Sequence, residues 1–233
     1  MLEAIDEAIW IADGPTVSFF GFPYPTRMTL VRLTDGGLWV CSPVRLDDDL
    51  RAAVERLGTV RHVVSPNKLH HLYLGEWAQA WPEAKLYASP GLAKRRPDLN
   101  FSAELSDQAE PAWVADIDQV IFRGSFAMEE VVFFHRRSRS AIFTDLIQKF
   151  DRAEQHGWRG AAMILDGLVG PDGSTPREWR LSFWNRRAAR AALQKALLWN
   201  PRRLLIAHGT WVRENGREAL ARSLRWLDGR AVP

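Results

Sequence analysis

The sequence contains a single cysteine, Cys41, so no disulfide bond can form within its 233 residues. A disulfide-stapled secreted domain is therefore excluded, and the composition fits a reducing compartment. Cys41 lies in the apolar run GLWVCSPV, which favours a buried thiol over a nucleophile. Long hydrophobic runs are also missing, since no stretch approaches the ~20 apolar residues of a membrane-spanning helix. The first residues carry acids where a secretion signal carries basic residues, and we expect a cytoplasmic protein that does not enter the membrane.

Lysine is scarce as well, and neither sign of charge dominates. Five of the 31 basic residues are lysines, and the formal net charge is only +3. This balance does not favour a nucleic-acid-binding protein. Arginine clusters at residues 136–139, 186–190 and 202–203 leave two interpretations open, because they either pair with acids on a solvated surface or dock an anionic partner. The remaining composition, 46% hydrophobic and 25% charged, is that of an ordinary globular protein.

The first third of the chain is rich in strand-like segments. The apolar bursts IWIAD, SFFGF, MTLVRLTDG and GLWVCSP are separated by Gly, Pro and Asp turns, as in β-hairpins. Asp35-Gly36-Gly37 predicts a hairpin turn, because glycine tolerates the positive φ that such turns need. Pro23 and Pro25 in FPYPTRM favour a surface loop over a central strand.

From residue 46 onward helices and strands alternate. Apolar spacing and capping residues predict helices over 46–58, 74–84, 185–200 and 215–229. Short apolar runs predict strands over 60–65, 84–90, 119–124, 130–136, 140–146 and 202–209, with a polar, proline-punctuated segment at 94–116. Strands followed by helices imply sheets covered by helices, which is an α/β layered fold. No linker divides the chain, so we expect one domain spanning residues 1–233.

Three of the six histidines stand at predicted strand ends. His70 and His71 follow the strand at 60–65, and His208 lies at the end of the strand at 202–209. Asp145 lies at the end of the strand at 140–146. In layered α/β folds the carboxyl ends of strands form the rim where ligands bind. Three imidazoles and one carboxylate at such a rim can converge on one metal ion, and imidazole suits both zinc and iron.

The same segments, in this order, resemble the metallo-β-lactamase superfamily. Its first motif is a strand followed by His-x-His-x-Asp-His, and VSPNKLHHLYLG is similar to a degraded copy of it. Pro66 and Lys68 stand at the two leading histidine positions, His70 stands at the aspartate position, and the final histidine is kept as His71. IFTDL resembles the strand that ends in the bridging aspartate, and LLIAHG resembles the late strand with the last metal-binding histidine. The resemblance implies a four-layer αβ/βα sandwich.

The resemblance also implies how many metal ions bind. In two-metal members the first metal uses both leading histidines, a middle histidine and the bridging aspartate. Here Pro66, Lys68 and the histidine-free turn at 124–126 stand in those places. Every position of the second metal keeps a residue able to bind it: His70, His71, Asp145 and His208. We therefore expect one divalent metal, zinc or iron, with the other site lost.

Three further residues are candidates for a substrate pocket. Lys68 stands where a ligand of the lost metal is expected, so its ammonium either replaces that charge and binds an anionic substrate group or points to solvent. His135 precedes Asp145 by one strand and either lines the same rim, orients a ligand or is an exposed strand-end residue. Trp211 follows His208 closely enough to form a pocket wall.

The sequence leaves different classes of function open. The first is a metal-dependent hydrolase that acts on a small-molecule substrate, and the second is a metal-free scaffold or binding module that keeps the fold. A protein that uses one iron for redox chemistry is a third. With four protein ligands a tetrahedral ion has no open position, so hydrolysis would require five-coordination. No catalytic residue, substrate or oligomeric state follows from the sequence.

Overall fold

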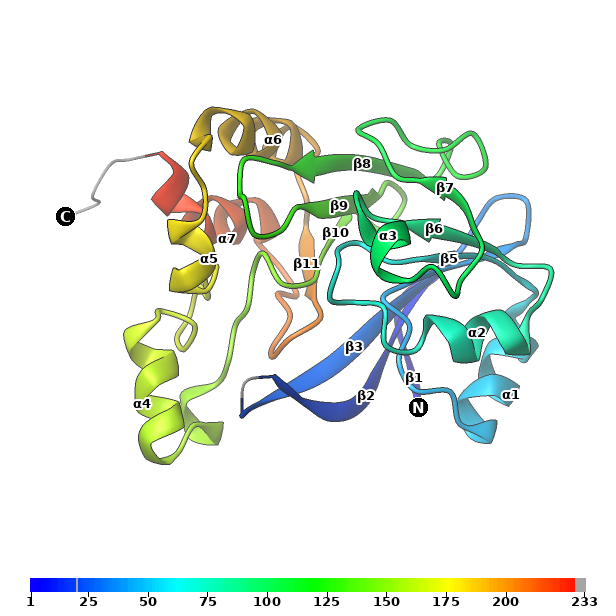
Figure 1. Cartoon of the computed structure of the whole chain (residues 1–233), viewed down its shortest axis with the longest axis horizontal. Coiled ribbons are helices and arrows are strands. Elements are labelled where there is room, and N and C mark those ends of the chain that lie inside the picture. Colours follow the sequence, from blue (N-terminus) through cyan, green and yellow to red (C-terminus); the bar gives the residue numbers. More distant parts are fainter. Residues whose placement is uncertain (20, 229–233) are drawn as a thin grey trace.

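Two β-sheets pack face to face in the computed structural model, which describes residues 1–19 and 21–228 (Figure 1). The larger sheet has seven strands in sequential order: β1 (Leu2–Asp6), β2 (Ile9–Phe19), β3 (Phe22–Arg32), β4 (Leu38–Cys41), β5 (Val60–Val64), β6 (Lys85–Ala88) and β7 (Phe101–Glu104). The smaller sheet has four strands in the order β11 (Arg203–Ile206), β10 (Ser140–Phe143), β9 (Glu130–His135) and β8 (Ile117–Phe122).

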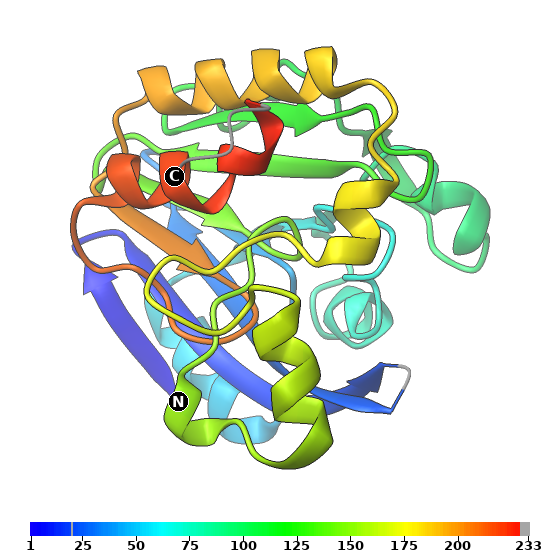
Figure 2. The same ribbon diagram turned by 90° about the vertical axis from the view of Figure 1, so that its left-hand side faces the viewer.

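Helices cover the outer faces of both sheets. The α-helices are α1 (Asp48–Leu57), α2 (Leu74–Ala80), α3 (Leu92–Arg95), α4 (Gly157–Leu165), α5 (Arg177–Leu181), α6 (Arg186–Leu198) and α7 (Gly216–Ser223). Two short 3₁₀ helices occupy Arg152–Glu154 and Arg225–Leu227. Apolar residues of α1, α2 and α3 pack on the larger sheet, and those of α6 and α7 pack on the smaller one. Figure 2 shows α6 running along the top of the molecule, above the smaller sheet.

The alternation of side chains along each strand builds the layers. In β4, Trp39 packs between the two sheets, whereas its neighbour Val40 packs under the helices of the larger sheet. In β9, Phe133 enters the layer between the sheets and Phe134 packs under α6. Strands buried on both faces read as continuous apolar runs, which is why VVFF and LWVC carry no polar residue. The chain is a four-layer αβ/βα sandwich, as predicted.

The parallel strands bring distant parts of the chain to one edge. β4, β5, β6 and β7 are parallel neighbours in the larger sheet, and β10 and β11 are parallel neighbours in the smaller one. Phe143 pairs with Ile206, so the segments that follow these two residues leave their sheet at the same end. This register places Asp145 and His208 side by side before any side-chain interaction is considered.

The FPYPTRM segment is part of a strand and not the surface loop that its prolines suggest. Residues 22–28 form the first half of β3, in which Pro23 pairs with Ser18 of β2. β4 pairs with β3 only from Thr29 onward, so the proline-bearing half of β3 has one neighbour. On an edge strand, a proline costs no hydrogen bond on its open side.

Other elements are confirmed or extended. The turn at Asp35-Gly36-Gly37 is confirmed, since Gly36 has φ +84° and the flanking strands β3 and β4 are antiparallel. The polar segment at 94–116 contains the end of α3 and the edge strand β7, which alternates half-buried and exposed residues. Within the described residues, no helix is both long enough and apolar enough to span a membrane.

Candidate metal centre

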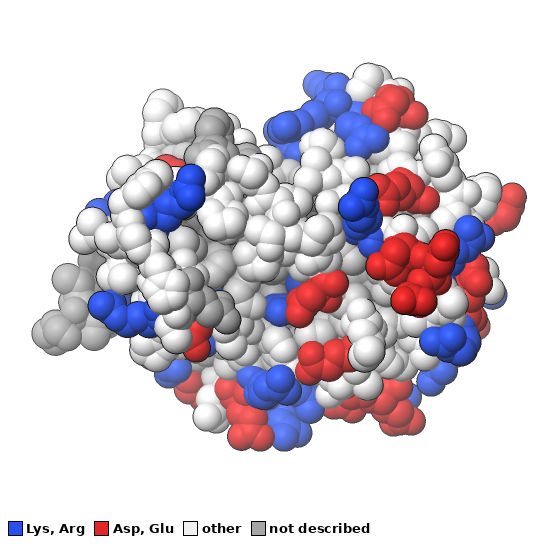
Figure 3. Space-filling model, turned by 90° about the horizontal axis from the view of Figure 1, so that it is seen from below, with Lys and Arg blue, Asp and Glu red and all other residues white. Residues whose placement is uncertain are grey.

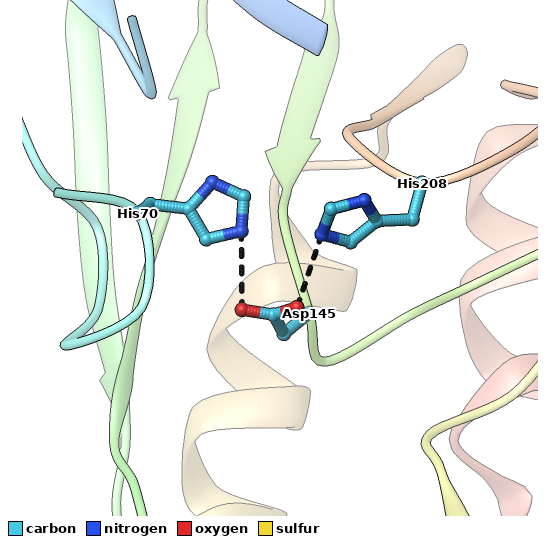
Figure 4. Close-up of side chains that lie close together, drawn as sticks. All are labelled: His70, Asp145 and His208. Atoms are coloured by element: carbon cyan, nitrogen blue, oxygen red, sulfur yellow. Dashed lines mark ion pairs between the residues drawn. The ribbon is translucent and has the colours of Figure 1, made fainter. Parts of the chain in front are cut away.

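Three side chains from the ends of three strands meet at one edge of the sandwich (Figure 4). His70 lies in the loop after β5, Asp145 follows β10, and His208 follows β11. Nε2 of His70 lies 3.1 Å from Oδ2 of Asp145, and Nε2 of His208 lies 3.1 Å from Oδ1 of the same carboxylate. One ligand atom from each residue lies within 4.8 Å of the other two, and all three residues are largely buried.

The hydrogen bonds of His208 point its second ring nitrogen at the carboxylate. Nδ1 of His208 lies 2.6 Å from the carbonyl oxygen of Pro25, and because a carbonyl only accepts, Nδ1 carries the proton. In the neutral ring, Nε2 then carries a lone pair that faces Asp145. A lone pair 3.1 Å from a carboxylate oxygen needs either a proton or a metal cation between them.

His70 is oriented in the same way by Ser42. Nδ1 of His70 lies 2.5 Å from the hydroxyl oxygen of Ser42, whose own donor reaches the carbonyl of Arg27 at 3.4 Å. A hydroxyl that donates to Arg27 accepts from His70, which again leaves Nε2 as the lone pair facing Asp145. Metal-binding histidines ordinarily use one nitrogen for the metal and donate the other N–H to such a partner. The residues present therefore fit a divalent ion.

A buried polar network fixes the carboxylate of Asp145. Nδ2 of Asn67 lies 2.8 Å from Oδ2 of Asp145 and 3.0 Å from Oε2 of Glu130. Glu130, which is fully buried, also accepts from the backbone N–H groups of Thr144, Asp145 and Leu146 and from the hydroxyl of Thr144. These bonds hold the segment after β10 against β9, so the orientation of Asp145 is set before any ligand binds.

The electrostatics of the site follow from burial and from these pairs. Burial alone would raise the pKa of Asp145, but the two imidazoles outweigh it and hold that pKa well below its usual range. Burial lowers the pKa of His208, but hydrogen bonding to Asp145 more than compensates and the net pKa is raised. Burial, together with the charge of Asp145, raises the pKa of Glu130. The low pKa of Asp145 keeps its carboxylate ionised, as a cation site requires.

The three residues line a cavity of about 580 Å³. Its walls come from the β2–β3 hairpin, the loop before α2, the segment at 126–128 and α5. About half of the lining residues are apolar or aromatic, and they include Leu69, Leu72, Phe126, Met128 and Trp179. A cavity of this size that combines apolar walls with convergent polar groups is typical of small-molecule sites.

His71 lies outside the group, although the sequence predicted it as a fourth ligand. Nη1 of Arg96 lies 3.2 Å from Nδ1 of His71 and donates to its carbonyl oxygen at 2.8 Å. His70 and His71 are consecutive residues in the turn before α2, so their rings diverge, and Arg96 holds the second ring on the cavity wall. Among the described residues, the group able to hold a metal has three members instead of four.

Of the pocket candidates, Lys68 lines the cavity and two others do not. His135 is buried at the opposite end of its sheet, where it pairs with Ser140 at the start of β10, and its Nδ1 bonds the hydroxyl of Ser138. β9 is antiparallel to β10, so its last residue lies away from Asp145. Trp211 is buried between the sheets, because the chain doubles back after Gly209 and pairs Val212 with Leu204.

Sequence reasoning missed Ser42 and Asn67, which orient His70 and Asp145. Ser42 has φ +56°, a conformation uncommon outside glycine that is enriched at functional sites. Asn67 lies inside the degraded motif. Residues that orient a ligand through a hydrogen bond occupy no fixed spacing in a sequence motif. The signal that could have found them is a polar residue predicted to be buried among apolar ones.

Comparisons with known proteins show the family and the fold. The family model described as a domain of unknown function (DUF4336) matches residues 6–156. No curated protein matches the chain. Solved metallo-β-lactamases match almost the whole chain: the enzyme from Pontibacter korlensis is 12% identical, with 99% of each chain covered and a TM-score of 0.66.

Two more solved structures agree. DIM-1 metallo-β-lactamase exposed to ceftazidime is 15% identical, with 98% of this chain and 96% of that one covered and a TM-score of 0.67. FIM-1 from Pseudomonas aeruginosa in the mono-zinc form is 13% identical, with 100% and 96% covered and a TM-score of 0.62. At these identities the similarity shows the fold alone.

Proposed function

The chain belongs to the family described as a domain of unknown function (DUF4336) and has the metallo-β-lactamase fold, and from its site we propose that it is a metal-dependent hydrolase. The proposed cofactor is one divalent ion, zinc or iron, held by His70, Asp145 and His208. The solved structure of FIM-1 in its mono-zinc form is a precedent for a single zinc ion in this fold.

One observation carries the proposal. Both imidazoles present Nε2 to the same carboxylate at the base of a cavity, while each Nδ1 is engaged by a neighbouring oxygen. Ligand atoms around a zinc ion with bonds of ~2.0–2.2 Å lie ~3–4 Å apart, which agrees with the two nitrogen–oxygen distances of 3.1 Å. Two histidines and one carboxylate are also a ligand set found in hydrolytic zinc sites.

With three protein ligands, a tetrahedral ion keeps one open position, which distinguishes catalytic from structural zinc sites. A divalent ion in such a site supplies Lewis acidity and lowers the pKa of bound water towards neutrality. The chain's own residues supply the rest. Ser42 and the carbonyl of Pro25 fix both ring orientations, Asn67 fixes Asp145, and the apolar residues of the cavity wall provide contact for a substrate.

Metal analysis of the purified chain tests the proposal. We expect about one zinc or iron per chain in the parent, and loss of that metal in Asp145→Asn and His208→Ala. His71→Ala is the matched control, since His71 lines the cavity but does not join the group. Metal retained in His71→Ala and lost in the other two variants supports the three-residue site. No metal in the parent after reconstitution with zinc and with iron rejects it.

A metal-free binding module is the second candidate, and one observation favours it. Nε2 of His208 lies 3.1 Å from Asp145, and the raised pKa of His208 favours the protonated ring, which donates to Asp145 without any metal. In that case the parent binds no metal, and Asp145→Asn lowers stability by removing the partner of a buried cation. The metal content of the parent therefore decides between the two candidates.

A further inference from the structure

Two cations without a partner line the cavity that holds the candidate metal centre. The side chains of Lys68 and Arg95 form no hydrogen bond or ion pair with any residue that the structure describes. Their neighbour Arg96, by contrast, is engaged by Asp98 at 2.7 Å. Cations that line a cavity but lack an acid inside the protein are available to a ligand.

The side chain of Lys68 extends towards the start of α3, the helix that ends at Arg95. Gly91 has φ +75°, and a Cβ built there would lie 2.9 Å from Cε and 3.1 Å from Nζ of Lys68. The ammonium group therefore rests on a position that only glycine leaves free. Gly91 directly precedes α3, and Arg95 is the last residue of that helix. The two cations thus belong to the same side of the cavity, formed by α3 and the loop before α2.

The acidic residues that line the cavity do not pair with Lys68 or Arg95. Asp145 is matched by two imidazoles and by Asn67. Glu178 also lines the cavity, but it belongs to α5, which lies apart from α3 in Figure 1. On the face shown in Figure 3, acidic and basic side chains are interspersed towards the right, and uncharged surface prevails towards the left. Lys68 and Arg95 are therefore the cations that this side of the cavity presents to a ligand.

Another part of the cavity offers apolar contact. Phe126 is 70% exposed and Leu72 is 58% exposed, yet both line the cavity, so they present apolar surface at its mouth. Phe126 packs edge to face on Trp184, with ring centroids 5.3 Å apart. Met128 and Trp179 continue the apolar wall. Contiguous exposed apolar residues beside a cavity commonly mark a ligand surface.

We propose that the ligand of this cavity is an amphiphilic anion, with its carboxylate, sulfonate or phosphate group beside Lys68 and Arg95 and its apolar body against Phe126, Met128 and Trp179. As a statement about substrate class this rests on the proposed function, because a hydrolase places the reacting bond at the metal centre. As a statement about binding it does not depend on the metal.

A pair of matched fluorescent probes tests the inference. 8-Anilinonaphthalene-1-sulfonate and N-phenyl-1-naphthylamine share one ring system, and only the first carries an anionic group. Titrations on the intact chain in buffer with EDTA measure binding without metal. We expect the parent to bind the anionic probe about tenfold more tightly than the neutral one, as a charge-assisted contact predicts.

Single substitutions then locate the effect. Lys68→Met and Arg95→Met should each weaken the anionic probe about five- to tenfold and leave the neutral probe unchanged. Lys94→Met is the matched control, because Lys94 is an exposed residue of α3 outside the cavity. Phe126→Ser should weaken both probes alike, since Phe126 supplies apolar contact only.

Two results would overturn the inference: equal affinities of the parent for the two probes, or equal losses in Lys94→Met and Lys68→Met. Both readings are independent of the metal analysis. A chain that holds metal but fails this test remains a candidate hydrolase for neutral substrates. A chain without metal that passes it is a module that binds amphiphilic anions.

Discussion

Five donor groups converge on the buried carboxylate of Glu130, and they include the backbone N–H groups of three successive residues after β10. Glu130→Gln keeps the shape but turns one acceptor into a donor that faces another N–H. We expect a loss of about 2 kcal/mol in the free energy of unfolding, measured with denaturant. Glu129→Gln, the half-buried neighbour, is the control, and equal losses in both variants would contradict the role of Glu130.

Burial lowers the pKa of His135 in the folded chain below its ordinary value of 6.5. The unfolded chain therefore binds a proton first as the pH falls through 6.5, and stability is lost in that direction. We expect His135→Gln to show a smaller fall in Tm between pH 7 and pH 5 than the parent. Burial also lowers the pKa of His62, so the Tm of the variant should still fall somewhat between pH 7 and pH 5. An unchanged pH dependence would show that His135 does not contribute.

Arg27 shows how one element of the larger sheet positions a residue of the smaller one. It is held by Asp13 on β2, and its Nη1 donates to the carbonyls of Ile206 and Gly209 at 2.8 and 2.7 Å. These carbonyls flank His208. Arg27→Met should therefore loosen the segment at 207–210, seen as faster amide hydrogen exchange there and weaker metal binding.

Arg32→Met is the control for this effect, since Arg32 lies on the same strand but is exposed over the ring of Trp10. If exchange at 207–210 rises equally in both variants, β3 as a whole and not the Arg27 contact holds the segment. If it rises in neither, the strand β11 alone positions His208.

At the scale of elements, the sequence predicted those strands and turns that apolar runs and turn residues specify. The hairpin at Asp35-Gly36-Gly37 and the strand ends before Asp145 and His208 follow from apolar runs bounded by turn residues. Pro23 and Pro25 misled the interpretation of β3, because a sequence does not show whether a strand has one neighbour or two. The edge strand β7 was missed for a related reason, since its residues alternate with polar ones in a polar segment.

The site could be predicted where ligands stand at strand ends, and not elsewhere. Asp145 and His208 meet because β10 and β11 are parallel neighbours, which the order of segments implies. His71 follows His70 directly, and no pattern shows which of two consecutive residues in a turn faces a cavity. Ser42 and Asn67 reach the ligands from other segments, so their roles depend on tertiary contacts alone.

For the whole molecule, the arginine clusters had left two interpretations open, and acid pairing is confirmed for several members. Arg136 pairs with Asp118 at 2.6 Å, Arg203 pairs with Asp6 at 2.8 Å, and Arg202 pairs with Glu214 at 3.3 Å. The pair between Arg203 and Asp6 joins the smaller sheet to the first strand of the larger one. An exposed pair such as Arg202 with Glu214 contributes little stability, ~0–1 kcal/mol, so its removal should not unfold the chain.

The smaller sheet is completed by segments from beyond residue 156. The family model matches residues 6–156, but the segment at 157–228 supplies β11, an edge strand of the smaller sheet, and the helices α6 and α7, which cover its outer face. A fragment of residues 1–156 would expose Val132, Phe134 and Phe143, which are buried in the full chain. We propose that residues 1–233 form one folding unit, so the fragment should lack a cooperative thermal transition.

Circular dichroism of the fragment beside the full chain measures this. A molten fragment keeps a far-ultraviolet signal and loses its near-ultraviolet one. Side chains such as Phe134 lose their packing there, since Phe134 stacks at 5.4 Å on Trp199, which the fragment lacks. A sharp transition in the fragment would instead mean that the larger sheet, with β8, β9 and β10, folds alone. The C-terminal segment would then be an addition that brings His208 to a centre already half built by His70 and Asp145.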